Sequence, residues 1–285
     1  MISFVSNHIT FRIAFPEYPV SLFVDHFVLM DGAPSGAEER LFPNNKSEIF
    51  FNLGHRVTGQ AHDTPQPFYL TESVVSGTRN RHFTFHPGAS LSMAGLRFTL
   101  FGFNLLFGIP AYHFTDQNLY TSDVWGKEME WIREQLLEAT TYGARIQVLH
   151  NWIVSKIPAT SFQDVCKWKL VERQMLQQQA SVTSLLEKTI GYSHKHSLQL
   201  IKEKSGLTPK AIQKVSRFDR SLRLLNHQTS VDWAALALDA GYADQSHFIR
   251  EFRQFTGCTP SSYLKEKPRI YRMYEQLETR SGASE

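Results

Sequence analysis

Residues 241–260 read GYADQSHFIREFRQFTGCTP, and this stretch predicts a helix with a defined start and end. Gly241 permits a tight turn, after which the Asp244 side chain can accept hydrogen bonds from the free amides of a new helix. Gly257 suits the left-handed residue that ends a helix. The stretch therefore predicts a helix entered through a glycine turn, which is the second half of a helix-turn-helix.

The side chains of this helix divide into two faces. Three phenylalanines recur at i, i+4 and i+7 and predict a buried stripe: Phe248, Phe252 and Phe255. The other face is mostly polar and carries Gln245, Ser246, Ile249, Arg250 and Arg253. A helix in the major groove of DNA needs such a face, because glutamine pairs with adenine and arginine with guanine, each good pair giving about 1–3 kcal/mol of discrimination. A merely solvated polar face is the alternative interpretation.

The same pattern occurs a second time, earlier in the chain. The closing tetrapeptides GLTP and GCTP begin at Gly206 and Gly257, and a Gly-Tyr pair opens each segment. A short helix is expected before each opening glycine, over 182–189 and 231–240, and a long helix over 209–226 joins the two copies. We call residues 182–206 the first unit and residues 231–257 the second unit. Two helix-turn-helix units in one chain favour DNA binding over a solvated face.

The first unit is less regular than the second. When the units are aligned on their closing glycines, Ser197 falls at the position of the buried Phe248, and Leu198 falls at the position of Ile249 on the exposed face. Lys195 and Gln199 still point outward and are candidates for contacts to phosphate or to bases. We therefore expect the first unit to touch DNA but to discriminate sequences less well than the second unit.

The N-terminal part of the chain predicts a β-rich domain. Short aromatic and β-branched runs alternate with turn clusters, over residues 20–30, 48–53, 67–70, 82–85 and 91–98. Many short strands at close spacing are typical of a sandwich or a barrel. Helical patterns follow over 124–140 and 144–157, and their apolar faces either form a dimer interface or pack on the barrel.

Length and composition agree with two globular domains. The chain has 285 residues, of which 42% are hydrophobic and 20% charged, which excludes a disordered or disulfide-framework protein. We expect an α+β protein: a β-rich, barrel-like domain with two appended helices over 1–158, a helical linker over 159–180, a double helix-turn-helix domain over 181–267 and a tail over 268–285.

Charge is distributed unevenly between the two parts. Residues 1–180 hold 14 Lys and Arg against 16 Asp and Glu, whereas residues 181–285 hold 16 against 11. A basic excess confined to the C-terminal part is expected when only that part touches a polyanion. The first ten residues lack a basic start with an apolar run, and the apolar stretch 95–110 is interrupted by Arg97. We therefore expect no signal peptide, no membrane contact and a cytoplasmic location, at the nucleoid when DNA is bound.

The second unit, with GLTPKAIQKVSR over residues 206–217, resembles the paired helix-turn-helix domain of AraC/XylS-type transcription regulators over about residues 170–266. In that family, outward residues early in each second helix contact bases. The resemblance implies such contacts by Gln245, Ser246 and Arg250, and by Lys195 and Gln199 in the first unit; Arg253 is a further cation on the same face. The family usually has an apolar residue at the position of Ser197 and a polar one at that of Leu198, which weakens the case for base contacts by the first unit.

The N-terminal part resembles a β-rich domain of uncharacterised function that precedes this DNA-binding module. The similarity lies in LFP (41–43), EIFFNLG (48–54), GLRF (95–98) and FGIP (107–110). Such domains in the wider family are often cupin-like barrels, so the resemblance implies a domain that binds a small effector or dimerises. The sequence leaves the identity of the effector open.

Signatures of common enzyme chemistry are absent from the sequence. It has no phosphate loop, nucleophile elbow, zinc-protease helix or dinucleotide fingerprint, so we expect no enzyme, no catalytic residues and no cofactor. His82 and His86, with Glu48 and His62 as companions, are the candidate metal ligands of a cupin-like barrel. Lone histidines in strands are more often hydrogen-bonded residues, and we expect no metal. The aromatic side chains of the strands either line a pocket, with Arg97 as an anchor for an acid group, or pack the core.

The sequence as a whole predicts a one-component, sequence-specific DNA-binding transcription regulator. Its expected partner is double-stranded DNA, and further candidates are RNA polymerase, a small-molecule effector and a second copy of the chain. Two alternatives stay open. One is an enzyme or ligand-binding barrel with an accessory DNA-binding module, and the other is an interaction module that has lost DNA reading.

Overall fold

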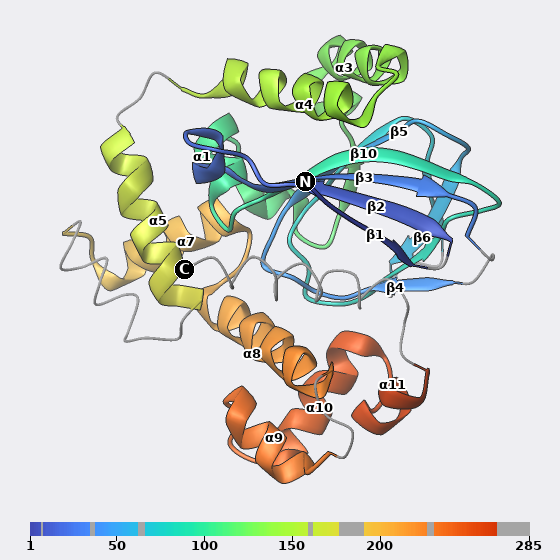
Figure 1. Ribbon diagram of the computed structural model, residues 1–285. Coiled ribbons are helices and arrows are strands. Elements are labelled where there is room, and N and C mark those ends of the chain that lie inside the picture. The colour runs from blue at the N-terminus through green and yellow to red at the C-terminus, as the bar shows by residue number, and fades with distance from the viewer. Residues whose placement is uncertain are drawn as a thin grey trace.

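The computed structural model describes residues 1–6, 8–34, 38–61, 66–158, 162–176, 191–226 and 231–266. Two antiparallel sheets are formed within the first 120 residues, and helices make up most of the described residues after them (Figure 1). None of the helices in these ranges is both long and apolar enough to cross a bilayer.

The larger sheet has seven strands in the order β1-β2-β3-β10-β5-β8-β11. Its strands are β1 (Ile2–Ser6), β2 (Ile9–Ala14), β3 (Val24–Gly32), β5 (Glu48–Asn52), β8 (Ser73–Ser76), β10 (Leu91–Phe98) and β11 (Asn118–Tyr120). β10 lies at the centre and pairs antiparallel with β3 and β5. Side chains on both faces of β10 are buried, because it lies between two apolar layers.

The smaller sheet has four strands in the order β4-β9-β6-β7. They are β4 (Glu39–Leu41), β6 (Val57–Ala61), β7 (Phe68–Leu70) and β9 (Phe83–His86). The predicted class, α+β with a β-rich N-terminal domain and a helical C-terminal domain, is confirmed. In the strands that the structure describes, the two sheets do not join into a closed barrel, so the arrangement is that of a sandwich.

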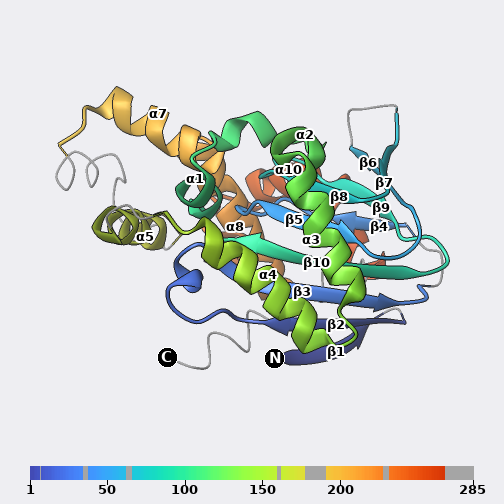
Figure 2. The same cartoon turned by 90° about the horizontal axis from the view of Figure 1, so that it is seen from above.

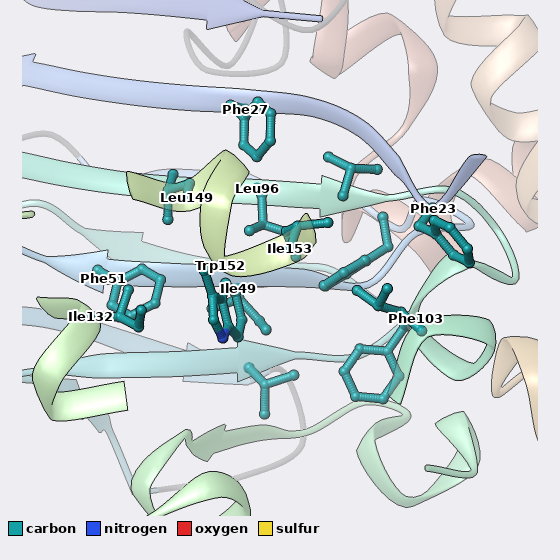
Figure 3. Packing of buried hydrophobic residues seen from close by; sticks show 14 of the residues in the cluster. Phe23, Phe27, Ile49, Phe51, Leu96, Phe103, Ile132, Leu149, Trp152 and Ile153 are labelled. Carbon is teal, nitrogen blue, oxygen red and sulfur yellow. The ribbon is translucent and has the colours of Figure 1, made fainter. Parts of the chain in front are cut away.

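Two apolar cores flank the larger sheet. One lies between the sheets and includes Phe11, Val28 and Met93. The other lies between the larger sheet and the helices that cover its outer face, where Phe27, Phe51, Leu96, Leu149 and Trp152 come together (Figure 3). Burial on both sides explains why strands near the centre are almost uniformly apolar.

The covering layer consists of short helices that follow β10. They are α1 (Gly102–Phe107), η2 (Ala111–Phe114), α2 (Ser122–Trp125), α3 (Lys127–Glu138) and α4 (Tyr142–Lys156), with η1 (Val20–Leu22) from the start of the chain. α4 crosses the strands of the larger sheet (Figure 2). Glu128 of α3 accepts hydrogen bonds from Trp152 Nε1 at 3.1 Å and from Lys156 Nζ of α4. The helical patterns at 124–140 and 144–157 thus correspond to helices whose main apolar faces pack on the sheet.

The C-terminal part is entirely helical in the residues that the structure describes. Its helices are α5 (Phe162–Leu176), α7 (His194–Ser205), α8 (Pro209–Asn226), α9 (Trp233–Ala240), α10 (Gln245–Thr256) and α11 (Pro260–Glu266). The expected long helix over 209–226 is confirmed, and the helix expected over 231–240 begins at Trp233. The helix expected over 182–189 lies outside the described residues.

Several strands differ from the sequence-based expectation. β1 and β2 precede residue 20, where no strand was expected, and β6 covers residues expected to form a turn. Gly59 explains why no strand was expected at β6, since glycine normally marks a turn. Here a Cβ at Gly59 would lie 2.2 Å from Phe83 Cζ, so the ring fills the space that a side chain would occupy.

The core that α8 and α11 form with the second unit is joined to the β-rich part through the segment that follows β4. Phe42 is buried in this core and contacts Phe218 of α8 and Tyr263 of α11, with ring centroids 6.0 and 5.8 Å apart. Asn45 donates to Ser216 Oγ at 2.9 Å and to the Ile212 carbonyl at 3.2 Å. The residues that directly follow β4 thus pack against the C-terminal helices.

The first unit is joined to the β-rich part at the end of α7. Thr78 and Thr115 donate to the carbonyls of Ser205 and Gly206 at 3.0 and 2.9 Å. Gly206 has a positive φ of 80°, and a Cβ there would lie 2.6 Å from Thr115 Oγ1 and 2.7 Å from Thr78 Oγ1. The helix α5, which precedes α7, also contacts the β-rich part, because its Glu172 accepts a hydrogen bond from the Leu100 amide at 2.9 Å. α5 is therefore a packed helix between the two parts.

We predict that Phe42→Ala destabilises the whole chain, because it removes a fully packed ring from the core that α8 and α11 form with the second unit. The expected loss is about 3–5 kcal/mol in the free energy of unfolding, measured by urea denaturation. The control is Phe15→Ala, at a half-exposed ring, for which we expect about 1 kcal/mol or less. Equal losses for the two variants would contradict the burial of Phe42.

Candidate nucleic-acid interface

The second helix of the second unit, α10, is held at both ends as the sequence predicts. Gly241 has a φ of 94°, a left-handed conformation that favours glycine, and it lets the chain turn between α9 and α10. The Asp244 carboxylate accepts the His247 backbone N–H at 2.7 Å and so satisfies a free amide of the first turn. α10 ends at Gly257, also left-handed.

The two faces of α10 separate as predicted. Phe248, Phe252 and Phe255 are buried, and Phe252 and Phe255 pack on Phe218 of α8 with ring centroids 5.5 and 4.9 Å apart. The candidate contact residues Gln245, Ser246, Arg250 and Arg253 are exposed. All four therefore project outward from one helix whose opposite side is fixed in the core.

A buried carboxylate that was not singled out from the sequence also anchors α10. Glu251 is buried, and its carboxylate lies 3.2 Å from an Arg217 guanidinium nitrogen of α8 and 3.9 Å from Lys214 Nζ. Burial and the nearby Glu251 carboxylate raise the pKa of Tyr242 well above its usual range. Helical periodicity places Glu251 beside the phenylalanine stripe, and its partner on α8 shows how the buried charge is neutralised.

The second helix of the first unit, α7, has the same construction with a different surface. Ser193 accepts the His196 amide at 3.4 Å as N-cap. Lys195 and Gln199 are exposed as predicted, whereas Ser197 is completely buried and Leu198 is exposed. Within the described residues, the Ser197 hydroxyl has no hydrogen-bond partner. The polar residue at the buried position and the apolar residue at the exposed position, both seen in the sequence, are thus present in the structure.

Cations gather on the outer surfaces of both units and of α8. The exposed lysines and arginines there include Lys195, Lys202, Lys210, Arg220, Arg250 and Arg253. Lys204 is different, because it donates to Asn104 Oδ1 at 3.0 Å and lies 5.0 Å from the centroid of the Trp168 ring. Its contacts are to the β-rich part and to α5. The other six are free to approach a phosphate backbone.

The candidate metal ligands do not come together in the described part of the chain, where no group of three or more His, Cys, Asp or Glu side chains could hold an ion. His62 lies outside it, and a Cβ added at Gly257 would lie 3.0 Å from His82 Cε1, so that imidazole packs on the end of α10. Arg97 donates to Glu48 Oε1 at 2.6 Å. Arg97 is thus engaged by a carboxylate of the protein.

Comparison with known families agrees with this geometry. Residues 186–266 match a helix-turn-helix domain, and residues 13–120 match a domain of unknown function, DUF6597. No curated protein sequence matches the chain.

Among solved structures, ToxT from Vibrio cholerae (P21 form) is similar with 12% identity and a TM-score of 0.44, covering 84% of this chain and 97% of that one. ToxT with a bound unsaturated fatty acid gives 13% identity and a TM-score of 0.43, with 84% and 94% covered. The cupin_2 domain of an XRE family transcriptional regulator from Enterobacter cloacae gives 13% and 0.25, covering 32% of this chain and 95% of that one.

The helix-turn-helix match and the exposed cationic face of α10 define the class of protein: it is a DNA-binding transcription regulator. More narrowly, it is a regulator with an AraC-type helix-turn-helix domain, preceded by the domain of unknown function. The sequence-based recognition is thereby confirmed.

We predict that Arg217→Gln loosens α10 without touching its outer face, because it leaves the buried Glu251 carboxylate without its closest cation. The expected cost is about 2–3 kcal/mol in the free energy of unfolding, below the usual range for a broken buried pair because Lys214 remains nearby. Arg220→Gln, at an exposed position of α8, is the matched control and should change stability by about 0.5 kcal/mol or less. Thermal unfolding of the three proteins at neutral pH is the measurement.

Proposed function

We propose that α10 reads DNA sequence in the major groove through Gln245, Ser246 and Arg250, with Arg253 contacting phosphate. The observation that carries this proposal is the rigid mounting of α10: its phenylalanine stripe and Glu251 are buried while these four side chains are exposed. A helix held in this way can present a fixed set of donors and acceptors to base edges.

The first unit contributes mainly affinity. Lys195 and Gln199 of α7 are exposed and lie at the positions that correspond to Ser246 and Arg250 of α10. Between them Leu198 offers an apolar side chain that suits a thymine methyl group at most. We propose that Lys195 contacts phosphate and that α7 discriminates sequences poorly.

The remaining parts of the proposal concern the rest of the regulator. The chain divides into a sensing domain over 1–158, a helical linker over 159–180, the DNA-binding domain over 181–267 and a tail, and it acts in the cytoplasm as a one-component regulator without catalytic activity. RNA polymerase is the expected protein partner on DNA, and a small molecule bound by the β-rich part is the expected signal.

A second copy of the chain is the proposed partner of α3 and α4. Trp131 is 56% exposed and Leu137 and Val154 are 44% and 45% exposed, although the other faces of these helices are buried on the sheet. A groove between the two helices is lined by Trp131, Val148 and Trp152 together with polar side chains such as Gln135 and Asn151. An exposed tryptophan in a groove of mixed polarity is typical of an interface between proteins.

The function is tested by selection from random-sequence duplex DNA, with binding measured at two salt concentrations. We expect an enriched motif and affinity that falls steeply with salt, because cations displace counterions from phosphates. Binding to duplex DNA without any enriched sequence would overturn the proposed reading by α10.

Two variants distinguish contacts to bases from contacts to phosphates. Arg250→Ala should lose about 1–3 kcal/mol on the selected site and much less on a scrambled one. Lys195→Ala should weaken both sites alike and lower the slope of log K against log salt by about 1. Equal losses of Arg250→Ala on matched and scrambled duplexes would refute its base contact.

The dimer is tested by sedimentation over a range of concentrations. We expect Trp131→Glu to raise the dissociation constant of the dimer by more than about tenfold, because it replaces the large exposed aromatic side chain of this surface with a charge. Leu238→Glu, at an exposed position of α9, is the matched control and should leave the dimer intact. A wild-type monomer at all concentrations would rule out this partner.

A further inference from the structure

An apolar cavity lies between the two sheets and is separate from the surfaces assigned to DNA. It has a volume of about 70 Å³ and its apolar lining includes Met30, Leu41, Phe50, Leu70, Val74 and Met93. This is less than half of the ~150 Å³ of a cavity that takes up benzene. The space therefore suits a short aliphatic group better than an aromatic ring.

One end of the cavity is charged. Arg79 lines it together with Glu48, Ser76 and Asn118. The Arg79 side chain is buried, with 9% of the residue exposed, and its guanidinium donates to Ser76 Oγ at 2.8 Å and to Asn118 Oδ1. Both acceptors are neutral. The guanidinium carbon also lies 4.6 Å from the centroid of the Phe83 ring.

Arg79 keeps its charge in this setting. Burial lowers the pKa of Arg79 to about 10, and the carboxylates of Glu48 and Asp116 oppose that change, so the guanidinium is protonated at neutral pH. Within the described residues no carboxylate oxygen forms an ion pair with it, and the nearby Glu48 is paired with Arg97. A buried cation with neutral partners is costly unless an anion joins it.

We propose that the cavity binds a short aliphatic carboxylate, with the carboxylate on Arg79 and the hydrocarbon part among the apolar side chains between the sheets. Arginine offers two parallel N–H donors to a carboxylate, and this charge-assisted geometry is stronger than the neutral hydrogen bonds that Arg79 now makes. A ligand of this class satisfies both ends of the cavity.

The segment that carries Arg79 also touches both helix-turn-helix units. Its neighbour Thr78 donates to the carbonyl of Ser205, the last residue of α7, at 3.0 Å. Three residues after Arg79, His82 packs on Gly257, the residue that ends α10. A ligand that draws Arg79 toward the cavity therefore acts on the ends of both candidate DNA-contacting helices. This regulatory consequence rests on the proposed function, whereas the ligand site does not.

The site is tested on the full chain by calorimetry with straight and branched carboxylates of three to eight carbons, each compared with the corresponding alcohol. We expect binding of the acids with a preference for the shorter chains, and affinity for the alcohols lower by about 10- to 100-fold, as the loss of charge-assisted hydrogen bonds implies. Equal affinity for acids and alcohols, or no binding of any acid, would overturn the proposal.

Three variants assign the site. Arg79→Gln should lower affinity for the acids by the same factor, and Arg81→Gln, at an exposed position of the same segment, should bind them as the wild type does. Met93→Phe fills the cavity without touching the cation and should also abolish binding, which guards against misfolding of Arg79→Gln. Unchanged acid affinity in both Arg79→Gln and Met93→Phe would place the ligand elsewhere and refute this site.

The coupling is measured separately, as DNA affinity with and without the tightest-binding acid. Thr78→Val should bind the acid normally but lose most of the acid-dependent change in DNA affinity seen in the wild type. A wild type that binds the acid and DNA independently would refute the coupling alone. Acid binding in a protein that never binds DNA would refute the proposed function and leave the ligand site standing.

Discussion

Burial of the phenylalanine stripe of α10 against α8 is the constraint on which the DNA-binding surface depends. Phe252 and Phe255 contact Phe218, and Glu251, directly before Phe252, pairs with Arg217. Because these contacts fix the rotation of α10 about its axis, the direction of Gln245, Ser246 and Arg250 follows without any further contact. The same core receives Phe42 from the β-rich part. The surface proposed to read DNA and the domain that precedes it therefore depend on one apolar cluster.

The helical half was predictable because its signals are local. Caps, glycine turns and a stripe at i, i+4 and i+7 all lie within a dozen or so neighbouring residues, and α8 and α10 have the expected bounds. Strand signals are weaker, since pairing partners lie far apart in the chain. The strand β6, which holds Gly59, was missed for this reason, because the ring that covers this glycine, Phe83, is distant in sequence. The strands β1 and β2 were missed although they pair with each other across a short turn.

The same argument explains what was missed at the candidate sites. Arg97 stands out in an apolar run, so an anchor for an acid group was one of two open interpretations, but its partner Glu48 lies 49 residues away in the chain. Arg79 sits in a turn cluster and looks solvated, yet the fold buries it beside Asn118. The exposed cations of α7 and α10 could be found because helical periodicity separates outer from inner positions. By contrast, whether a charged side chain is buried beside a partner depends on residues far apart in the chain, and no local pattern indicates it.

Gly206 illustrates how closely the two halves are matched. Its left-handed backbone ends α7, and the hydroxyls of Thr78 and Thr115 occupy the space where a side chain would project. A substitution there meets two separate obstacles, one from the backbone of its own helix and one from the neighbouring domain. During divergence this contact can change only through simultaneous substitutions in distant parts of the gene. When a helix-turn-helix region is exchanged between related regulators, the residues of the β-rich domain that contact Gly206 therefore have to be exchanged with it.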